Sequence, residues 1–575
     1  MATAACAGTN RRSDAEALPE SFYTVTAELA LARHEPRVAA LQYAAAAARD
    51  DSLLQRAVEV SVETLQPSVG LATAQRWIKV DPDSLDARRA AGSAALELYQ
   101  IEQSAADYRF VIAHSPNGVE AELGALEKEL RNEDDPYGVR QLADHLAGDF
   151  PASAAALRLQ GFAALRADDP AAAVRSFEAA LARTGEPADA AKPGDTVKSG
   201  DAAKSGDAAV AVAAADARRD LVDALLRARV LSGDADAALT EAAAQVAHED
   251  TPENQFAYSL LLWAAKRDPQ VREQLKVLLA KPDFAADALR VLALLEFQAG
   301  NDDDAGVRFA ELLATGRYVE DGFYYLGLIA ERHGDFERAL RWYSRVQSGD
   351  NTVPALLRAA AILHAHGAES TADELLERLI EDEPARVPEI IAGQAQIYVQ
   401  AGDPARATTL LDRALAQYPD SVELRYARAT SLEQQGQVDA ALRELTAIAR
   451  DRPEDPAALN ALGYTLADHS RHLARARALV ERAYAAAPKS AAIRDSLGWV
   501  LYRQGHSQAA LPYLEGAYAD EPGGDIGAHL GEVLWQLGKK ADAERIWSTA
   551  SRIDSDDRLL KATRRRLHAE QPEGG

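Results

Sequence analysis

Apolar residues recur along this chain at helical spacing, and turn-forming residues interrupt the stripes at regular intervals. Residues 493–522 hold two such stripes, which are Leu497, Val500 and Leu501, then Ala510, Leu514 and Ala517. Gly505 separates the stripes, and glycine readily adopts the left-handed backbone that ends a helix. Pro522 stands where the second helix must stop, because proline lacks a backbone N–H. The stretch therefore predicts two helices joined by a tight turn.

The same pattern returns with a period near 34 residues. Its clearest marker is an alanine that recurs every 33 to 35 residues, at Ala305, Ala339, Ala372, Ala407, Ala441, Ala476, Ala510 and Ala543. A glycine stands five residues before most of them, at Gly300, Gly334, Gly367, Gly402, Gly436, Gly505 and Gly538. One repeat has His469, Ser470 and Arg471 in its turn instead, and prolines close repeats at Pro384, Pro419, Pro453, Pro488 and Pro522. We expect the alanines where two helices cross, since a small side chain permits close approach.

A period near 34 with these marker residues resembles the tetratricopeptide repeat, in which each unit is a pair of antiparallel helices. The implied fold class is all-α, a tetratricopeptide α-solenoid in which stacked helix pairs form a right-handed superhelix. One pair cannot bury its apolar face alone, so stacking is obligatory. Similar markers, Gly161, Ala173, Phe177 and Ala180, extend the template toward the N-terminus, and the array is predicted to start near Glu20 with about fourteen or fifteen pairs.

The repeats divide the chain into segments. We expect a flexible N-terminus at 1–19, helix pairs at 20–184, an insertion at 185–209, irregular pairs at 210–284, a regular array at 285–557, and a basic helical cap with a tail at 558–575. The insertion contains three copies of a six-residue unit, each starting with a lysine, at Lys192, Lys198 and Lys204. These units lack large apolar side chains, so they cannot offset the entropy of ordering and are predicted to be disordered.

Composition narrows the classes of function. The 575 residues include 63 Lys and Arg against 89 Asp and Glu, for a net charge of −26. Such a surface disfavours nucleic acid, whose binding depends on neutralising phosphates. The hydrophobic share of 47% and charged share of 26% exclude wholesale disorder and a multispan membrane protein.

Enzyme signatures are absent from the sequence. It contains no serine nucleophile elbow, phosphate-binding loop, dinucleotide fingerprint or zinc-protease helix. His469 and His472 lie in an inter-helix turn and we assign no third ligand to them, so we expect a solvated turn there. The run Asn301–Asp304 lies where a helix needs an N-cap. An additional catalytic domain needs about 100 residues outside the repeats, and none are left. We therefore expect no catalytic residues, cofactor or metal site.

The resemblance to tetratricopeptide arrays implies a binding groove lined by the first helix of each pair. The second, fifth, ninth and twelfth positions of the units place there Tyr324, Tyr426, Asn460, Tyr464, Asp495, Trp499, Tyr502, Glu532 and Trp535. Exposed Trp and Tyr are typical interface anchors, and the carboxylates favour cationic partner segments. Trp499, Tyr502 and Trp535 are expected to form one continuous patch. The alternative is that some of these aromatic side chains pack between helices.

The last third of the chain carries a closer resemblance. Residues 458–468, 495–505 and 528–535, with Gly538 and Trp547 after them, resemble the C-terminal block of proteobacterial tetratricopeptide lipoproteins. The best-known type is an outer-membrane lipoprotein adaptor that binds a periplasmic carboxyl-terminal processing protease and presents cell-wall hydrolases to it. The resemblance implies a non-catalytic scaffold with protein partners of that kind.

The single cysteine, Cys6, bears on localisation. Residues 3–8 resemble the end of a bacterial lipoprotein signal, in which small residues precede the cysteine that is lipidated. If an in-frame signal lies upstream of Met1, this implies a lipid anchor at Cys6 on the periplasmic face of the outer membrane. Otherwise Cys6 is incidental, and the chain is a cytoplasmic scaffold or regulator with unrelated clients. The sequence leaves both interpretations open.

Overall fold

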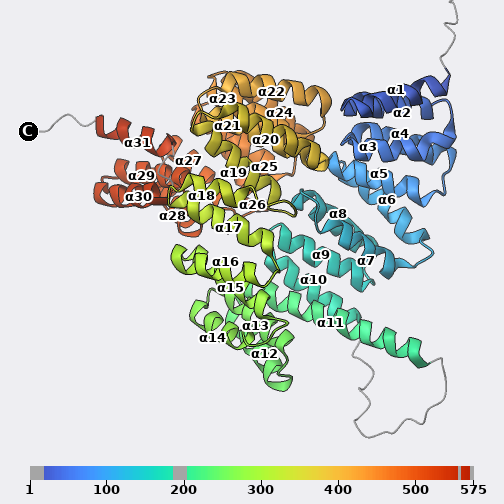
Figure 1. The fold of residues 1–575 in the computed structure, drawn as a ribbon, viewed down its shortest axis with the longest axis horizontal. Coiled ribbons are helices and arrows are strands. Elements are labelled where there is room, and N and C mark those ends of the chain that lie inside the picture. The colour runs from blue at the N-terminus through green and yellow to red at the C-terminus, as the bar shows by residue number, and fades with distance from the viewer. Residues whose placement is uncertain (1–18, 185–203, 554–557, 570–575) are drawn as a thin grey trace, which may run out of the picture. The chain divides into compact units, whose positions relative to one another are not determined.

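The computed structural model describes residues 19–184, 204–553 and 558–569, with side chains left out for 204–216 and 569. These residues form 31 α-helices and two short 3-10 helices, and they contain no β-strand (Figure 1). Successive helices pack as pairs, for example α25 with α26, α27 with α28 and α29 with α30, and each pair contacts the next. The predicted all-α fold of stacked helix pairs is confirmed.

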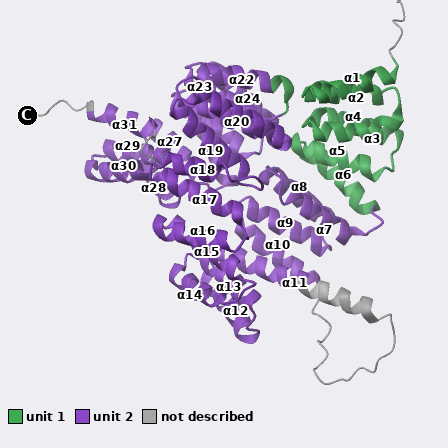
Figure 2. Ribbon diagram, in the orientation of Figure 1, with its two compact units in different colours: residues 1–114, 415–420 green, residues 115–414, 421–575 purple. Residues whose placement is uncertain are grey.

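The chain divides into two compact units (Figure 2). Unit 1 comprises Met1–His114 with Leu415–Asp420, and unit 2 comprises Ser115–Ala414 with Ser421–Gly575. The helices of the first 114 residues are α1 Glu20–Ala32, α2 Pro36–Ala47, η1 Asp51–Leu53, α3 Leu54–Glu63, α4 Pro67–Val80, α5 Leu85–Glu97 and α6 Ile101–His114.

The remaining helices follow in the order of the chain. Up to the regular array they are α7 Val119–Leu130, α8 Pro136–Asp149, α9 Ala154–Arg166, α10 Pro170–Arg183, α11 Lys204–Ser232, α12 Ala235–His248, α13 Pro252–Ala264 and α14 Asp268–Leu278. The array continues with α15 Ala285–Gln298, α16 Asp302–Ala314, α17 Val319–Arg332, α18 Phe336–Tyr343, α19 Thr352–Ala365, α20 Glu369–Asp382, η2 Pro384–Arg386, α21 Val387–Gln400 and α22 Pro404–Gln417. It ends with α23 Val422–Gln434, α24 Val438–Asp451, α25 Pro456–Asp468, α26 Leu473–Ala486, α27 Ala491–Arg503, α28 Ser507–Asp520, α29 Gly524–Gln536, α30 Lys540–Ile553 and α31 Arg558–Ala569.

The repeat markers occupy the positions that their chemistry predicts. All eight marker alanines are at most 2% exposed. The seven marker glycines have φ between 73° and 89°, which side chains other than glycine rarely adopt. In the repeat without the glycine, Ser470 and His472 take the left-handed backbone, with φ of 51° and 46°. The helices before the closing prolines each end two residues earlier, as α28 does at Asp520 before Pro522.

A second set of glycines, inside the first helices of pairs, is explained by close packing. A Cβ placed on Gly531 of α29 lies 1.9 Å from Trp547 Nε1 of α30. The same holds for Gly161, whose Cβ position is 2.3 Å from Phe177. Glycine costs up to about 1 kcal/mol relative to alanine inside a helix, but here only glycine leaves room for the facing aromatic ring.

The middle of the chain departs in detail from the sequence-based boundaries. Helix α11 begins at Lys204, so residues 204–209 of the predicted insertion are helical, while 185–203 lie outside the described residues. The irregular pairs expected at 210–284 are α11 with α12 and α13 with the short helix α14. At the predicted cap of α16, Asn301 occupies the N-cap position, but its side chain donates a hydrogen bond to Glu296 instead of accepting one from the helix.

Unit 2 also contains contacts between segments far apart in sequence. Arg452, which follows α24, donates to Asp135 at the start of α8, with Nη1 and Oδ2 2.9 Å apart. Tyr137 of α8 packs against a buried cluster that includes Leu459 and Ile493. These contacts join helix pairs that are not neighbours in the array, so the repeat period alone does not predict them.

Two features of the chain bear on an association with a membrane, the cysteine near the N-terminus and the apolarity of the helices. Cys6 lies outside the described residues. Among the helices that the structure describes, none has the length and apolarity needed to cross a membrane.

Candidate partner-binding site

The last repeats enclose a cavity of about 920 Å³, called here the C-terminal cavity. Helix α31 contributes four of its twelve lining residues, and α27 and α29, the first helices of the last two pairs, contribute three and two. The lining residues are Asp468, Trp499, Tyr502, Arg503, Gly505, Ser507, Glu532, Gln536, Leu559, Ala562, Thr563 and Arg566. Six of these, Asp468, Trp499, Tyr502, Arg503, Gly505 and Glu532, come from the blocks 458–468, 495–505 and 528–535.

A buried polar cluster lies behind the cavity wall. His529 of α29 is fully enclosed, and its Nδ1 lies 2.8 Å from Asp495 Oδ2 of α27. The indole of Trp499 stacks on the imidazole with 4.1 Å between ring centroids, and Tyr464 Oη lies 3.5 Å from His529 Nε2. Burial lowers the pKa of His529, but the adjacent Asp495 carboxylate outweighs burial, so the pKa is raised overall. This cluster binds α25, α27 and α29 together.

Trp499 therefore belongs to the core. It is 5% exposed, and its Nε1 donates to Asp468 Oδ1 at 3.1 Å. The sequence left open whether Trp499 is an exposed anchor or packs between helices, and in the structure it packs, because α29 brings His529 against the face of the indole. Tyr502 remains half-buried at the cavity, with its ring centroid 5.2 Å from that of Trp499.

The carboxylates of the site are paired within the chain. Glu532, 5% exposed, accepts hydrogen bonds from Tyr502 Oη at 3.0 Å and from Arg566 Nη2 of α31 at 2.5 Å. Asp468 also accepts from Arg503 Nη1 at 3.3 Å, and Asp495 binds His529. Asp495 and Glu532 were expected to favour cationic partners, but both carboxylates are buried and already bonded within the chain, to His529 and to Arg566.

Trp535 does not join the patch that was expected with Trp499 and Tyr502. It is absent from the lining of the C-terminal cavity, and its ring lies 5.5 Å from Trp547 and 5.1 Å from His568. Lys540 Nζ stands 4.9 Å from its ring centroid. Trp535 thus packs among α29, α30 and α31.

The three remaining predicted groove residues come before the residues of the C-terminal cavity in the chain. Tyr324 of α17 is half-buried beside Tyr343 of α18. Tyr426 of α23 and Asn460 of α25 are also half-buried, and their Oη and Oδ1 atoms are enclosed without a hydrogen-bond partner among the described residues. Burial raises the pKa of both Tyr324 and Tyr426. None of the three lines the C-terminal cavity.

One group of ligand-type side chains was missed by sequence reasoning. Ligand atoms of Glu433, Asp468 and His469 lie within 4.8 Å of one another, whereas His472, the histidine paired with His469 in the sequence analysis, is not part of the group. His469 Nε2 is 2.7 Å from Glu433 Oε1, 36 residues earlier, across adjacent repeats. Both Trp499 and Arg503 donate to Asp468. The group therefore forms a hydrogen-bonded network at the edge of the C-terminal cavity.

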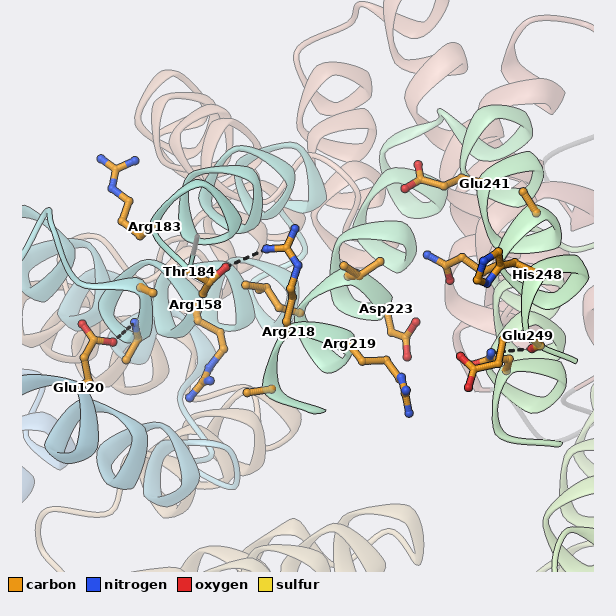
Figure 3. Close-up of a pocket in the computed structure, with 18 of the residues that line it drawn as sticks. Glu120, Arg158, Arg183, Thr184, Arg218, Arg219, Asp223, Glu241, His248 and Glu249 are labelled. Atoms are coloured by element: carbon orange, nitrogen blue, oxygen red, sulfur yellow. Dashed lines mark hydrogen bonds between the residues drawn. The ribbon is translucent and has the colours of Figure 1, made fainter. Parts of the chain in front are cut away.

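A second cavity, of about 1300 Å³, lies among α9, α11 and α12 (Figure 3). Eight of its nineteen lining residues are charged, and Arg158, Arg218, Arg219 and Glu249 project around it (Figure 3). It is bounded by Thr184 and Ala217, the side chains on either side of those left undescribed. No sequence signal singled out this region, because its charged residues recur at no fixed position of the repeat.

Comparison with known proteins settles the type of repeat. Residues 398–463 and 496–557 both match the tetratricopeptide repeat. The fold is thus an all-α tetratricopeptide-repeat (TPR) solenoid. Over 214 residues it is 32% identical to the TPR repeat-containing protein PA4667 of Pseudomonas aeruginosa, a match that covers 37% of this chain and 36% of that protein. The chain thus spans about a third of the length of this curated relative.

Three solved structures are also similar to parts of the chain or to most of it. A TPR protein of Thermus thermophilus is 21% identical and covers 32% of this chain and 97% of its own, with a TM-score of 0.29. A TPR protein of Parabacteroides merdae is 18% identical, with coverage of 43% and 98% and a TM-score of 0.31. The structure of the APC/C hetero-tetramer Cut9–Hcn1 is 15% identical in sequence, covers 95% of this chain and 96% of its own, and has a TM-score of 0.30.

Proposed function

We propose that this TPR protein is a non-catalytic scaffold that holds a partner protein in the C-terminal cavity. TPR arrays generally act by binding proteins, and the cavity is the observation that carries the proposal to this end of the chain. Its volume of about 920 Å³ lies within the range of small-ligand pockets, which is room for a few side chains of a partner segment. Aromatic and aliphatic walls from Tyr502 and Leu559 stand beside the polar edges of Arg503 and Gln536.

The charges of the cavity favour a partner segment of mixed character. Each carboxylate at the wall already has a cationic neighbour, as Glu532 has Arg566. A strongly cationic segment would have to displace these arginines, and breaking a buried pair is costly. A segment with apolar side chains and a few polar groups instead packs against Tyr502 and Leu559 and leaves the pairs intact.

A second, more specific proposal names the partner protein and the cellular location. We propose that the protein is a lipid-anchored adaptor, attached through Cys6 to the periplasmic face of the outer membrane. In that role it binds a carboxyl-terminal processing protease together with cell-wall hydrolases that are the substrates of the protease. This proposal rests on the resemblance of 458–468, 495–505 and 528–535 to lipoprotein adaptors and on the residues around Cys6.

A variant that fills the cavity tests the binding site. Ala562 lines the cavity and is exposed, so Ala562→Trp occupies space without removing an existing contact. Ala492→Trp of α27 is the matched control, because Ala492 is exposed and lies outside the cavity lining. We expect Ala562→Trp to weaken capture of the processing protease in a pull-down at least tenfold and the control to bind like the wild type. Equal binding by all three proteins refutes the cavity as the site.

A separate experiment tests the location. Expressed from the gene with its upstream sequence, the wild type is expected to fractionate with outer membranes, and Cys6→Ser to become soluble or to accumulate unprocessed. If both proteins stay in the cytoplasm, the adaptor proposal fails, while the scaffold proposal is still judged by the cavity variants.

A further inference from the structure

The charge of helix α31 is opposite to that of the protein around it. The chain as a whole has a net charge of −26. Within its 12 residues α31 has no Asp or Glu and carries five cations, which are Arg558, Lys561, Arg564, Arg565 and Arg566. A local excess of this sign creates an attractive potential for anions on a surface that otherwise repels them.

The way α31 packs decides which of its residues are accessible. The helix lies against α29 and α30 at the end of the array (Figure 1). Leu560, Thr563 and Leu567, spaced three and four residues apart, are buried against these helices. The opposite side of α31 is exposed, and its residues Lys561, Arg565 and His568 are all accessible. The apolar stripe is therefore used by the fold, and the basic side remains on the surface.

This surface is concave. A cavity of about 490 Å³ lies between α30 and α31, and its lining consists of Ser551, Leu560, Lys561, Arg564, Arg565 and His568. We call this the basic pocket. Four of the six lining residues are basic, and they come from two successive turns of one helix. Because α31 rises about 1.5 Å per residue, the span from Lys561 to His568 is about 10 Å, which suits two or three acidic side chains.

The basic residues of the pocket differ in their ion pairs. Glu544 of α30 faces both Arg564, with Nη2 3.2 Å from Oε2, and His568, with Nε2 2.7 Å from Oε1. Arg565 differs from Arg564, because its Nε donates to the backbone carbonyl of Lys561 at 3.2 Å and it has no carboxylate partner among the described residues. Its guanidinium can therefore form a bidentate pair with an incoming carboxylate.

Three classes of anion would meet such a surface, and the structure favours one. Nucleic acid binding draws on about six to ten phosphate contacts, more than the few cations of this short helix supply beside a strongly acidic chain. An amphipathic helix binds a membrane by inserting its apolar face, but that face of α31 is buried in the protein. A concave pocket with cations around it instead fits carboxylate side chains that protrude from a peptide.

We propose that the basic pocket between α30 and α31 binds an acidic segment of a partner protein. This surface is separate from the C-terminal cavity, since Arg565 and Lys561 line only the basic pocket of the two. The proposal is also independent of the proposed function, because it depends on the outer face of α31 and not on what the cavity holds. A scaffold with both surfaces holds two segments on the two sides of one helix.

The test measures binding of a fluorescein-labelled oligo-glutamate peptide to the full-length protein by fluorescence anisotropy. The variants are Arg565→Gln and the double variant Lys561→Gln with Arg565→Gln. Arg378→Gln of α20 is the matched control, because Arg378 is exposed and its Nε also donates to a carbonyl oxygen one turn earlier, that of Glu374, at 3.2 Å. Both arginines thus have the same local geometry, but Arg378 lies on an acidic helix.

We expect the wild type to bind the acidic peptide and not an oligo-lysine peptide of equal length. Arg565→Gln should weaken binding about two- to fivefold, the double variant about tenfold, and Arg378→Gln not measurably. Added salt should weaken wild-type binding. The proposal is overturned if the wild type does not bind, or if Arg378→Gln loses as much as Arg565→Gln. It is also overturned if phosphatidylglycerol vesicles or duplex DNA bind through Arg565 while the peptide does not.

Discussion

Replacing Trp499 with alanine tests whether this residue stabilises the fold or anchors a partner. The structure predicts the first role, because the indole is 5% exposed and stacks on His529 at 4.1 Å. Truncation of a buried tryptophan costs about 3–5 kcal/mol of unfolding free energy, through lost transfer energy and the space left behind. It also removes the donor to Asp468 and uncovers the pair of His529 with Asp495.

Trp499→Phe provides the graded comparison. Phenylalanine keeps a ring against His529 but has no Nε1 to donate to Asp468, and a hydrogen bond to a charged acceptor contributes about 1.5–3 kcal/mol. We therefore expect Trp499→Phe to lose about half as much stability as Trp499→Ala. If both variants were equally destabilised, the stacking on His529 would contribute little.

The assay must report on one end of a long repeat array, because such arrays seldom unfold in a single two-state step. Hydrogen exchange meets this need when it is combined with thermal melts followed by circular dichroism. In Trp499→Ala, amides of α25, α27 and α29 should lose protection, while those of α15 and α16 should not change. A variant that keeps full protection and melts like the wild type, yet no longer captures a partner, would refute the packing argument.

Three further predictions follow from other contacts. Gly531→Ala should destabilise the C-terminal repeats by about 1–3 kcal/mol, because its Cβ falls 1.9 Å from Trp547 Nε1. Gly306→Ala has nothing within 4 Å of its Cβ and should instead stabilise α16 by about 0.5–1 kcal/mol. Thermal melts that rank the two variants the other way would contradict this. The raised pKa of His529 means that the folded state holds the imidazole proton more tightly than the unfolded state does. The resulting stabilisation is fully present below the unfolded pKa of about 6.5 and is lost as the pH rises through the folded pKa. Hydrogen-exchange protection of α29 should fall over that pH range, and His529→Gln should remove the pH dependence. Deletion of 185–203 should leave the melting temperature nearly unchanged, and a fall of many degrees would show that the insertion packs.

The spacing of small and turn-forming residues along the chain is enough to predict the repeat. Alanines where helices cross, glycines that take the left-handed backbone and prolines after helix ends act within one or two helix pairs, so their spacing predicts the element order and much of the core. The turn at His469–Arg471 shows how strong this local constraint is, because Ser470 and His472 adopt the left-handed backbone without glycine.

The accessibility of the predicted groove residues depends on the tertiary structure. Position in the repeat placed Trp499, Tyr502 and Glu532 on the same helix face, but their burial depends on what other repeats bring against them. His529 covers Trp499 from α29, and Arg566 reaches Glu532 from α31, 34 residues away. The contact of Arg452 with Asp135 spans 317 residues. Such pairings depend on how successive helix pairs stack in three dimensions, and a periodic sequence pattern carries no information about which surfaces then meet.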